Sequence, residues 1–379
     1  MADQGASSSE EALDRGATAE GRGTVVLDNV LKIYPGTDVP AVSEVSLSIR
    51  SGEFFSLLGP SGSGKTTTLR LIAGFEQPTE GTIRIAGKEV SGLPPFKRPV
   101  HTVFQNYALF PHMNVERNVA YPLRMRRLDK KVITEQVGAV LERVSMGEYA
   151  KRLPHQLSGG QRQRVALARA LVGQPEVVLL DEPLGALDLK LRQEMQLVLK
   201  HLQREVGITF VYVTHDQGEA LAMSDRIAIL SNGHINQVAT PLDVYFKPAT
   251  AFVARFVGKT NLLRCRSVGD GKVTHKSLTL KIAGTPARQD CVLSIRPESM
   301  KLGSAAEGCE NTVRGMVEEG IFQGTDVELR VKASDVTFLV RSRVDQKVSI
   351  GEEVVIGWDP EAAVLVDDDG ESLSAEASV

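Results

Sequence analysis

The sequence FFSLLGPSGSGKTTTLRLIAGF, residues 54–75, carries the strongest signal for the fold. Its apolar start, FFSLL, is typical of a strand buried on both faces, and TTLRLIAGF has the spacing of a helix. Between them, GPSGSGKT at 59–66 fits the pattern GxxxxGK[ST] in the strand–loop–helix setting that the pattern requires. Small residues let such a loop wrap phosphate oxygens with its backbone N–H groups, so the segment predicts a phosphate-binding loop.

Two side chains of this loop have distinct predicted roles. Lys65 would place its ammonium against the β- and γ-phosphates of ATP, and the Thr66 hydroxyl would coordinate Mg²⁺. The remaining loop residues are predicted to bind the nucleotide: Gly59, Pro60, Ser61, Gly62, Ser63, Gly64 and Thr67. The alternative, a Gly-rich turn that binds nothing, is disfavoured by the buried strand before it and the helix after it.

Three further motifs narrow the class of P-loop protein. VVLLDE at 177–182 predicts a buried strand that ends in Asp181, able to hold Mg²⁺ through water, and Glu182, able to orient or deprotonate a water. LSGGQ at 157–161 opens a predicted helix with Ser158 at its cap. VYVTHD places His215 at the carboxyl edge of the same sheet, where ligands bind in α/β folds. Taken alone, each has a structural alternative: a common strand end, an ordinary capped helix and a structural histidine.

The chain around these motifs predicts two domains, because 379 residues exceed what one hydrophobic core usually organises. VVLDNVLKIY and AVSEVSLSIR flank turn residues and predict antiparallel strands, while residues 113–173 are mostly helical in pattern. The strands EVVLLD and ITFVYVT enclose an amphipathic helix of the βαβ kind. Its apolar face is formed by Leu191, Met195, Leu199, Leu202 and Val206. The first domain, 24–258, is thus predicted to be an α/β core with a helical insertion.

The rest of the chain has a different residue pattern. Short alternating strands such as CVLSIR, VELRVKA and EEVVIGW predict an all-β domain of barrel or sandwich type over 259–366. Residues 1–23, rich in Ala, Ser, Gly and Glu, predict a disordered tail, and residues 367–379 predict an acidic tail. The three cysteines, Cys265, Cys291 and Cys309, have no CxxC spacing and predict idle thiols in a reducing compartment.

Composition excludes several functions. No apolar run approaches the roughly 20 residues that cross a bilayer, and the acidic N-terminus does not match a signal peptide, so a cytoplasmic protein is expected unless a partner holds it at a membrane. The formal net charge is −3, and both tails are acidic. The remaining small basic surplus argues against nucleic-acid binding.

Because the four motifs occur once each, in the order P-loop, LSGGQ, DE and His, residues 24–258 closely resemble the ABC ATPase family. The resemblance implies a P-loop NTPase fold with antiparallel β and helical subdomains. It also implies Tyr34 as the aromatic that stacks on adenine, Gln105 as the Q-loop glutamine near the metal and the reacting water, and GALD at 185–188 as the D-loop. Glu182 would be the catalytic base, and His215 would contact the γ-phosphate.

The family resemblance further implies a homodimer. Two subunits would face head to tail, so that the signature residues Ser158, Gly159, Gly160 and Gln161 complete the ATP site of the partner. Ser158 and Gly160 would cap the γ-phosphate in trans, and a monomer would hydrolyse ATP poorly. Two membrane permease subunits would receive the motor at the cytoplasmic face of the membrane, with QNYALFPHMNV, residues 105–115, as the contact segment. Leu109 and Phe110 could instead pack into the helical subdomain.

The C-terminal region points to a subclass. LSIRPESMKL at 293–302 and VVIGWDPEAAVLV resemble the TOBE domain of importer ATPases, which have an extracellular or periplasmic solute-binding protein as an indirect partner. KRPVHTVFQNYALFPHMNV and THDQGEALAMSDRIAIL are most similar to the polyamine (spermidine/putrescine) subgroup. Importers of iron, phosphonate, sulfate or sugar share much of this pattern, VERNVAYPLR departs from it, and a non-transport ABC ATPase is a further alternative.

Overall fold

The computed structural model describes residues 21–346, 348–368 and 370. By its internal contacts the chain divides into two compact units, Met1–Val238 and Ala239–Val379, so the division falls before the boundary expected at 258/259. The domain limits drawn from the sequence stay predictions. The expected tails at 1–23 and 367–379 lie outside the described residues, apart from 21–23, 367, 368 and 370.

A six-stranded sheet, in the order β10-β9-β3-β8-β7-β6, forms the centre of the first unit. Its strands are β3 (Phe54–Leu58), β6 (Val100–Val103), β7 (Val177–Asp181), β8 (Thr209–Thr214), β9 (Arg226–Ser231) and β10 (His234–Ala239). β3 runs parallel to both β8 and β9, and β7 lies parallel between β6 and β8. Every residue of β3 is buried, as FFSLL predicts for a strand covered on both faces.

A second, antiparallel sheet of the first unit has the order β2-β1-β4-β5. Its strands are β1 (Val25–Lys32), β2 (Val42–Ile49), β4 (Glu80–Ile85) and β5 (Lys88–Glu89). Val25 pairs with Ile49 on one side and with Ile85 on the other, which confirms the predicted antiparallel pairing of the first two strands. Apolar side chains of this sheet share one core with α1 (Lys65–Ala73) and with β3.

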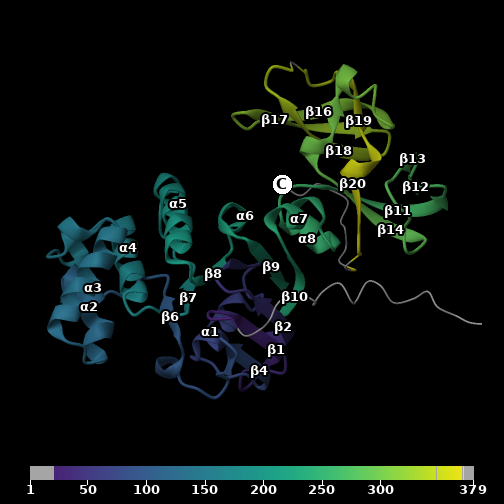
Figure 1. The fold of residues 1–379 in the computed structure, drawn as a ribbon. Coiled ribbons are helices and arrows are strands. Elements are labelled where there is room, and N and C mark those ends of the chain that lie inside the picture. Colours follow the sequence, from purple (N-terminus) through teal and green to yellow (C-terminus); the bar gives the residue numbers. More distant parts are fainter. Residues whose placement is uncertain (1–20, 347, 369, 371–379) are drawn as a thin grey trace, which may run out of the picture. The chain divides into compact units, whose positions relative to one another are not determined.

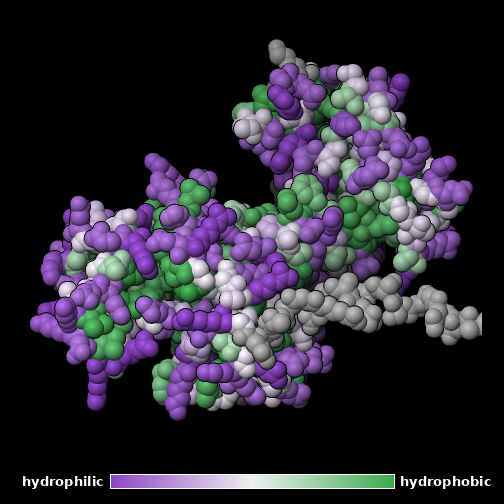
Figure 2. Space-filling view, viewed as in Figure 1, coloured by the Kyte–Doolittle hydropathy of each residue, from purple (hydrophilic) through white to green (hydrophobic). Residues whose placement is uncertain are grey.

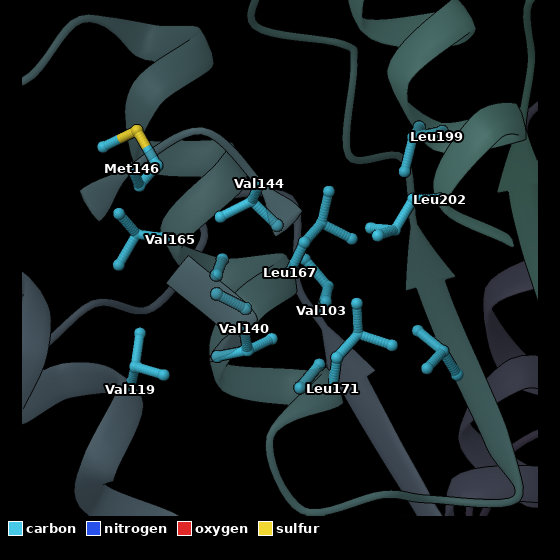
Figure 3. Packing of buried hydrophobic residues seen from close by; sticks show 14 of the residues in the cluster. Val103, Val119, Val140, Val144, Met146, Val165, Leu167, Leu171, Leu199 and Leu202 are labelled. Atoms are coloured by element: carbon cyan, nitrogen blue, oxygen red, sulfur yellow. The ribbon is translucent and has the colours of Figure 1, made fainter. Parts of the chain in front are cut away.

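Three helices form a separate helical layer, which Figure 1 shows on the side of the unit away from β1 and β2. They are α2 (Val115–Met125), α3 (Lys130–Arg143) and α4 (Gly159–Leu171). Figure 3 shows Val119, Val140 and Val165 of these helices turned toward one another, and the same cluster reaches Leu199 and Leu202 of α5 (Leu189–Val206). The helical insertion and the amphipathic helix predicted from the sequence are therefore present.

An arginine holds the end of α1 against the loop before β6. Arg98 is 5% exposed, and its guanidinium donates hydrogen bonds to four carbonyl oxygens. The acceptors are Leu71 (2.6 Å), Ile72 (3.0 Å), Ser91 (3.1 Å) and Leu93 (2.9 Å). Burial lowers the pKa of Arg98 to about 10. The last carbonyls of the helix that begins at the P-loop are thus satisfied by one buried cation.

Replacing this arginine is expected to destabilise the first unit. Arg98→Met would leave several buried carbonyls without donors, at a cost of about 3 kcal/mol. Urea unfolding at pH 7, followed beside the exposed control Arg84→Met, measures the effect. A loss of free energy of unfolding below about 0.5 kcal/mol, the usual scatter of surface substitutions, would contradict this account.

The second unit contains two short helices and two antiparallel five-stranded sheets, ordered β13-β12-β11-β14-β20 and β15-β19-β16-β17-β18 (Figure 1). Its elements are α7 (Pro241–Phe246), α8 (Ala251–Phe256), β11 (Asn261–Gly269), β12 (Lys272–His275), β13 (Leu278–Lys281), β14 (Asp290–Ile295), β15 (Lys301–Leu302), β16 (Asn311–Phe322), β17 (Asp326–Ala333), β18 (Val336–Arg343), β19 (Glu353–Trp358) and β20 (Ala363–Val366). Both sheets contribute to one core, in which the ring centroids of Phe338 and Trp358 lie 5.6 Å apart. The all-β prediction is confirmed.

The thiols of the second unit are free. Cys265 and Cys309 are buried, Cys291 is half-buried, and burial raises the pKa of Cys265 to about 12. A thiol with so high a pKa carries almost no thiolate at neutral pH, which agrees with the predicted idle role.

The surface visible in Figure 2 is mostly hydrophilic, with small apolar areas between charged side chains. Among the described residues, no helix combines the length and the apolar character that a bilayer crossing requires.

Candidate active site

The P-loop connects β3 to α1, and its glycines are required by close backbone contacts. A Cβ added to Gly59 would lie 2.2 Å from the carbonyl oxygen of Leu230, and one added to Gly64 would lie 2.5 Å from that of Ala41. Gly62 and Gly64 also have φ angles of +78° and +98°, which side chains disfavour. The loop is thus wound tightly, as a phosphate cradle requires.

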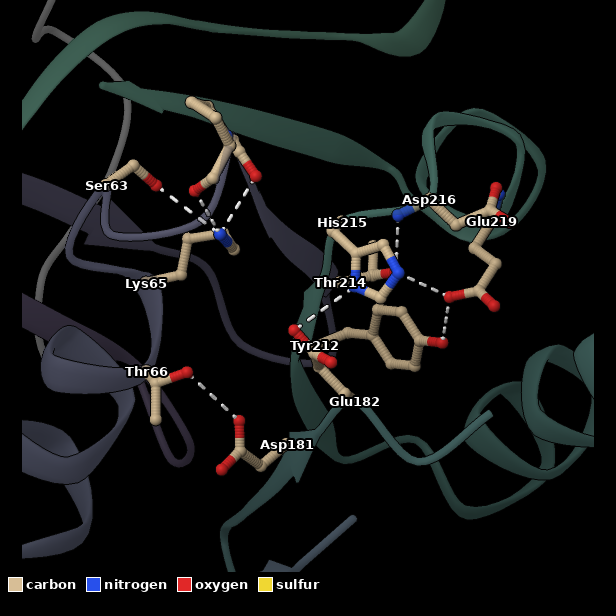
Figure 4. Close-up of polar contacts among 12 residues, drawn as sticks. Ser63, Lys65, Thr66, Asp181, Glu182, Tyr212, Thr214, His215, Asp216 and Glu219 are labelled. Carbon is tan, nitrogen blue, oxygen red and sulfur yellow. Dashed lines mark hydrogen bonds and ion pairs between the residues drawn. The ribbon is translucent and has the colours of Figure 1, made fainter. Parts of the chain in front are cut away.

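Lys65 lies over this loop at the first position of α1 (Figure 4). Its Nζ donates hydrogen bonds to the carbonyl oxygens of Gly59 (2.8 Å) and Pro60 (2.7 Å) and reaches Ser63 Oγ at 3.4 Å. Burial lowers the pKa of Lys65, and the nearby carboxylates of Glu182 and Asp181 act in the opposite direction. The ammonium is therefore held at the mouth of the loop, with acceptors that phosphate oxygens could replace. Ser61, on the same loop, is exposed, and Thr67 is half-buried.

Thr66 and Asp181 meet across the sheet edge. The Thr66 hydroxyl donates a hydrogen bond to Asp181 Oδ1 at 3.4 Å, so two oxygen donors from α1 and β7 converge on one point (Figure 4). Burial, and then the charge of Glu182, raise the pKa of Asp181. A divalent cation would relieve both effects, and a hydroxyl with a carboxylate is the oxygen-donor set that Mg²⁺ accepts beside nucleotide phosphates.

Glu182 and His215 form a pair at the ends of β7 and β8. His215 Nδ1 lies 3.3 Å from Glu182 Oε1, and the side chains are 61% and 24% exposed, so the carboxylate remains open to water. Glu182 has a φ of +44°, a left-handed conformation that a non-glycine residue adopts at a cost. This backbone twist turns its carboxylate toward the imidazole instead of continuing β7.

The Q-loop reaches the same region. A Cβ built on Gly185, in the segment after Glu182, would lie 3.6 Å from Gln105 Nε2, so the glutamine amide is close to the D-loop. Two residues after Gln105, Tyr107 and Ala108 have φ angles of +62° and +43°. Arg169 of α4 donates to both of their carbonyl oxygens at 2.7 Å and holds this strained turn in place.

The structure assigns the segment after Gln105 in part to the helical layer. Leu109 packs against the helical core, and the ring of Phe110 lies 4.6 Å from that of Tyr121 in α2. Both side chains therefore pack on the helical layer, as the alternative reading expected, but they stay half-exposed, and the permease contact stays a prediction. Gln105, Asn106 and Ala108 at the start of the segment and Pro111 further along it are exposed, and Met113 is half-buried, so these positions stay available to a partner.

The signature residues lie apart from this group. Ser158 caps α4 by accepting a hydrogen bond from the backbone of Gln161, whose side chain accepts one from the Ser158 backbone, which confirms the predicted cap. Gly159 and Gly160 lie against side chains from the D-loop and α5. No hydrogen bond among the described residues joins these four positions to the P-loop. The structure thus brings together Lys65, Thr66, Asp181, Glu182, His215 and Gln105, and leaves Ser158–Gln161 outside the group.

Tyr34 follows β1 and is half-buried, with the Lys32 ammonium 5.0 Å from its ring centre. Its role as an adenine-stacking aromatic stays a prediction.

The sequence reasoning missed several charged residues that surround the site. They are Arg169, which binds a backbone oxygen after the Q-loop glutamine, Arg192, which binds one in the D-loop, and Glu219, which accepts a hydrogen bond from Thr214 beside His215. They belong to helices α4, α5 and α6 (Gln217–Met223), and no local pattern distinguishes them from the solvated charges of those helices.

The family model described as ABC transporter matches residues 42–185, and the TOBE domain model matches residues 293–366. The dimeric post-hydrolysis structure of the ATP-binding cassette MJ0796 bound to ADP and Pi is similar over 57% of this chain and 98% of that chain, with 35% identity and a TM-score of 0.52.

Three curated relatives are similar over nearly the whole length. The spermidine/putrescine import ATP-binding protein PotA of Thermobifida fusca is 49% identical and covers 90% of this chain and 93% of its own length. PotA of Roseobacter denitrificans is 50% identical, covering 89% and 94%. The uncharacterized ABC transporter ATP-binding protein YdcT of Escherichia coli is 48% identical, covering 90% and 97%. The family resemblance drawn from the sequence is confirmed: this chain belongs to the ABC transporter family, as an ATP-binding protein with a C-terminal TOBE domain.

Proposed function

We propose that this chain hydrolyses ATP to energise the import of a polyamine, spermidine or putrescine, through a separate membrane permease. The observation that carries the ATPase part is the convergence of Lys65, Thr66, Asp181 and Glu182 at the end of β3 and β7. The polyamine part rests on the names of relatives that match the chain over both of its domains.

In the proposed reaction, water attacks the γ-phosphate in line with the leaving oxygen. Lys65 and the P-loop N–H groups bind the phosphate oxygens, and Glu182 orients the water and accepts its proton. Thr66 and Asp181, with Gln105 nearby, would hold Mg²⁺, which neutralises the charge of the phosphates. His215, which lies 3.3 Å from Glu182, would donate a hydrogen bond to the γ-phosphate.

The separation of the signature residues supports action as a homodimer. The backbone N–H groups of Ser158 and Gln161 are used within the cap of α4, so those of Gly159 and Gly160, in the first turn of the helix, would bind a nucleotide held by a second copy. ATP would hold two subunits together head to tail, and hydrolysis would release them. Two permease subunits would bind this dimer at the cytoplasmic face of the membrane, and a solute-binding protein would deliver the polyamine from the other side.

Deletion of the gene in the organism that carries it tests the substrate. Uptake of radiolabelled spermidine and putrescine is expected to fall and to return with the wild-type gene, but not with a Lys65→Met variant. If polyamine uptake stays unchanged while uptake of another solute, such as sulfate or a sugar, is lost, the polyamine proposal is wrong and the importer ATPase stands. If no uptake depends on the gene, the chain serves a partner other than an importer permease.

A further inference from the structure

An arginine of α5 contacts both the D-loop, which packs against the signature segment, and the loop that carries His215. Arg192 Nη2 donates a hydrogen bond to the carbonyl oxygen of Leu187 in the D-loop at 3.1 Å. Its Nη1 donates to Asp216 Oδ2, also at 3.1 Å, directly after His215. One planar guanidinium thus fixes the D-loop backbone and the His215 loop relative to each other.

The His215 loop is held on its other side by a buried carboxylate. Glu219 is 3% exposed, and its Oε2 accepts hydrogen bonds of 2.6 Å from both the Tyr212 and the Thr214 hydroxyls. The Thr214 oxygen in turn accepts a hydrogen bond from the Asp216 backbone (Figure 4). Arg192 Nε lies 3.7 Å from Glu219 Oε1, so the same cation neutralises this carboxylate. The residues on both sides of His215 are therefore rigidly placed by the network that Arg192 joins.

Leu187, the D-loop residue that Arg192 binds, packs against the signature segment. A Cβ added to Gly159 would lie 3.0 Å from Leu187 Cδ2, and one added to Gly160 would lie 2.9 Å from Leu191 Cδ1. Leu187 is buried, so its side chain has little space to withdraw. Movement of the Leu187 backbone would therefore shift the glycines that are proposed to face the partner's ATP.

Arg192 also borders the catalytic carboxylate. A cavity of about 30 Å³ is lined by Glu182, Gly185, Arg192, Thr214, His215, Asp216 and Glu219. The guanidinium thus faces the same enclosed space as the proposed base and the histidine.

We propose that Arg192 is a positioning residue that couples the two ATP sites of the dimer. The inference rests on the proposed function, in which His215 serves the ATP of its own subunit and Ser158–Gln161 serve that of the partner. The Arg192 guanidinium binds the Leu187 carbonyl and the Asp216 carboxylate at the same time. Because Leu187 packs against Gly159, the position of the signature segment then depends on the position of the His215 loop. The residue would act through these groups, without touching the nucleotide.

The chain offers a matched control on the same helix. Lys200 Nζ donates to the carbonyl oxygen of Met223 and to Asp225 Oδ1, so it also links α5 to the segment around α6. It lies two turns further along α5 and contacts neither the D-loop nor the His215 loop. Arg192→Met and Lys200→Met remove comparable interactions between α5 and the α6 segment, and only the first removes the proposed coupling.

Mixed dimers separate the two effects of Arg192. A small amount of wild-type chain, mixed with excess Glu182→Gln chain, pairs with subunits that hold ATP without cleaving it, so only the wild-type subunit hydrolyses. In the first arm, Arg192→Met is added to the excess Glu182→Gln chain, which supplies the signature segment. In the second arm, Arg192→Met is placed in the hydrolysing chain, which supplies His215. Arg192→Lys, which keeps the charge, is run beside each, with thermal unfolding of every variant.

Phosphate release is expected to fall about tenfold in both arms, because residues of a coupling network change the energy by such amounts. The Lys200→Met variants are expected to keep the rate of the parent mixture. A fall in the second arm alone would mean that Arg192 serves only the ATP site of its own subunit. Unchanged rates, or equal losses with Lys200→Met, would mean that Arg192 serves only the packing of α5. Each of these results overturns the inference. Wild-type chain that releases no phosphate by itself would overturn the proposed function instead.

Discussion

A Glu182→Gln variant is expected to hydrolyse ATP about a thousand times more slowly than the wild type, in the range typical of a lost general base. Glu182 lies at the end of β7 with its carboxylate 3.3 Å from His215 and still reachable by water. Glutamine keeps the size and the hydrogen-bonding capacity of this side chain, so binding of ATP should survive. It cannot accept a proton from the attacking water, so the reaction should stop before the dimer is released.

Phosphate release and light scattering at saturating ATP and Mg²⁺ measure both parts of this prediction. The variant should scatter as a dimer with ATP and as a monomer without it, while the wild type should return to monomer as ATP is consumed. Glu205→Gln, which changes an exposed carboxylate paired with Arg143, is the matched control and should behave as the wild type. A Glu182→Gln chain that stays monomeric and hydrolyses normally would remove both Glu182 and the signature residues from the mechanism.

The sequence predicted the parts of this site whose signals are local. Strand β3, the P-loop and α1 are adjacent in the chain, and the glycine pattern directly reflects the contacts that allow no side chain. The cap of α4 at Ser158 is equally local, because its partner Gln161 lies three residues later. The carboxyl ends of β7 and β8 could be brought together because parallel strands align their ends at one edge.

The parts that could not be predicted depend on contacts between distant segments. Arg98 binds the carbonyls of Leu71 and Ile72, which lie 27 and 26 positions before it. Arg169 binds those of Tyr107 and Ala108, which lie 62 and 61 positions before it. In the sequence these arginines look like the solvated charges of an amphipathic helix or a loop. Only the tertiary structure shows that their acceptors are backbone oxygens, for which no residue pattern exists.

The packing of Leu109 and Phe110 illustrates the same limit. An apolar pair beside the Q-loop is compatible with a permease contact and with the core of the helical layer. Asn118, which is fully buried, binds both the N–H and the carbonyl oxygen of Phe110 and so fixes this loop onto α2. An asparagine within a helical pattern gives no advance sign of that role.

A Lys65→Met variant is expected to bind ATP at least about thirtyfold more weakly than the wild type. Lys65 is 6% exposed, and its ammonium has only carbonyl and hydroxyl oxygens as hydrogen-bond acceptors in the loop. Losing one member of a buried, hydrogen-bonded charge pair costs about 2–5 kcal/mol, and each 1.4 kcal/mol is a factor of ten in affinity. Titration with a fluorescent ATP analogue measures the loss, and Lys88→Met, on the exposed strand β5, is the control with unchanged binding.

The same variant is not expected to unfold more easily. Burial lowers the pKa of Lys65, which means that the folded chain disfavours its charged form, so removing the charge relieves a cost of folding. This gain offsets the loss of two carbonyl hydrogen bonds, one of them to the exposed Pro60, whereas Arg98 serves four carbonyls. The thermal midpoint of Lys65→Met should therefore equal or exceed that of the wild type in the absence of nucleotide, while the rise in midpoint that ATP gives the wild type should disappear. A variant that keeps the ATP-dependent rise would show that the P-loop binds phosphate through its backbone alone. A variant with a lowered midpoint would show instead that Lys65 stabilises the loop, and the loss of binding would then follow from a distorted P-loop.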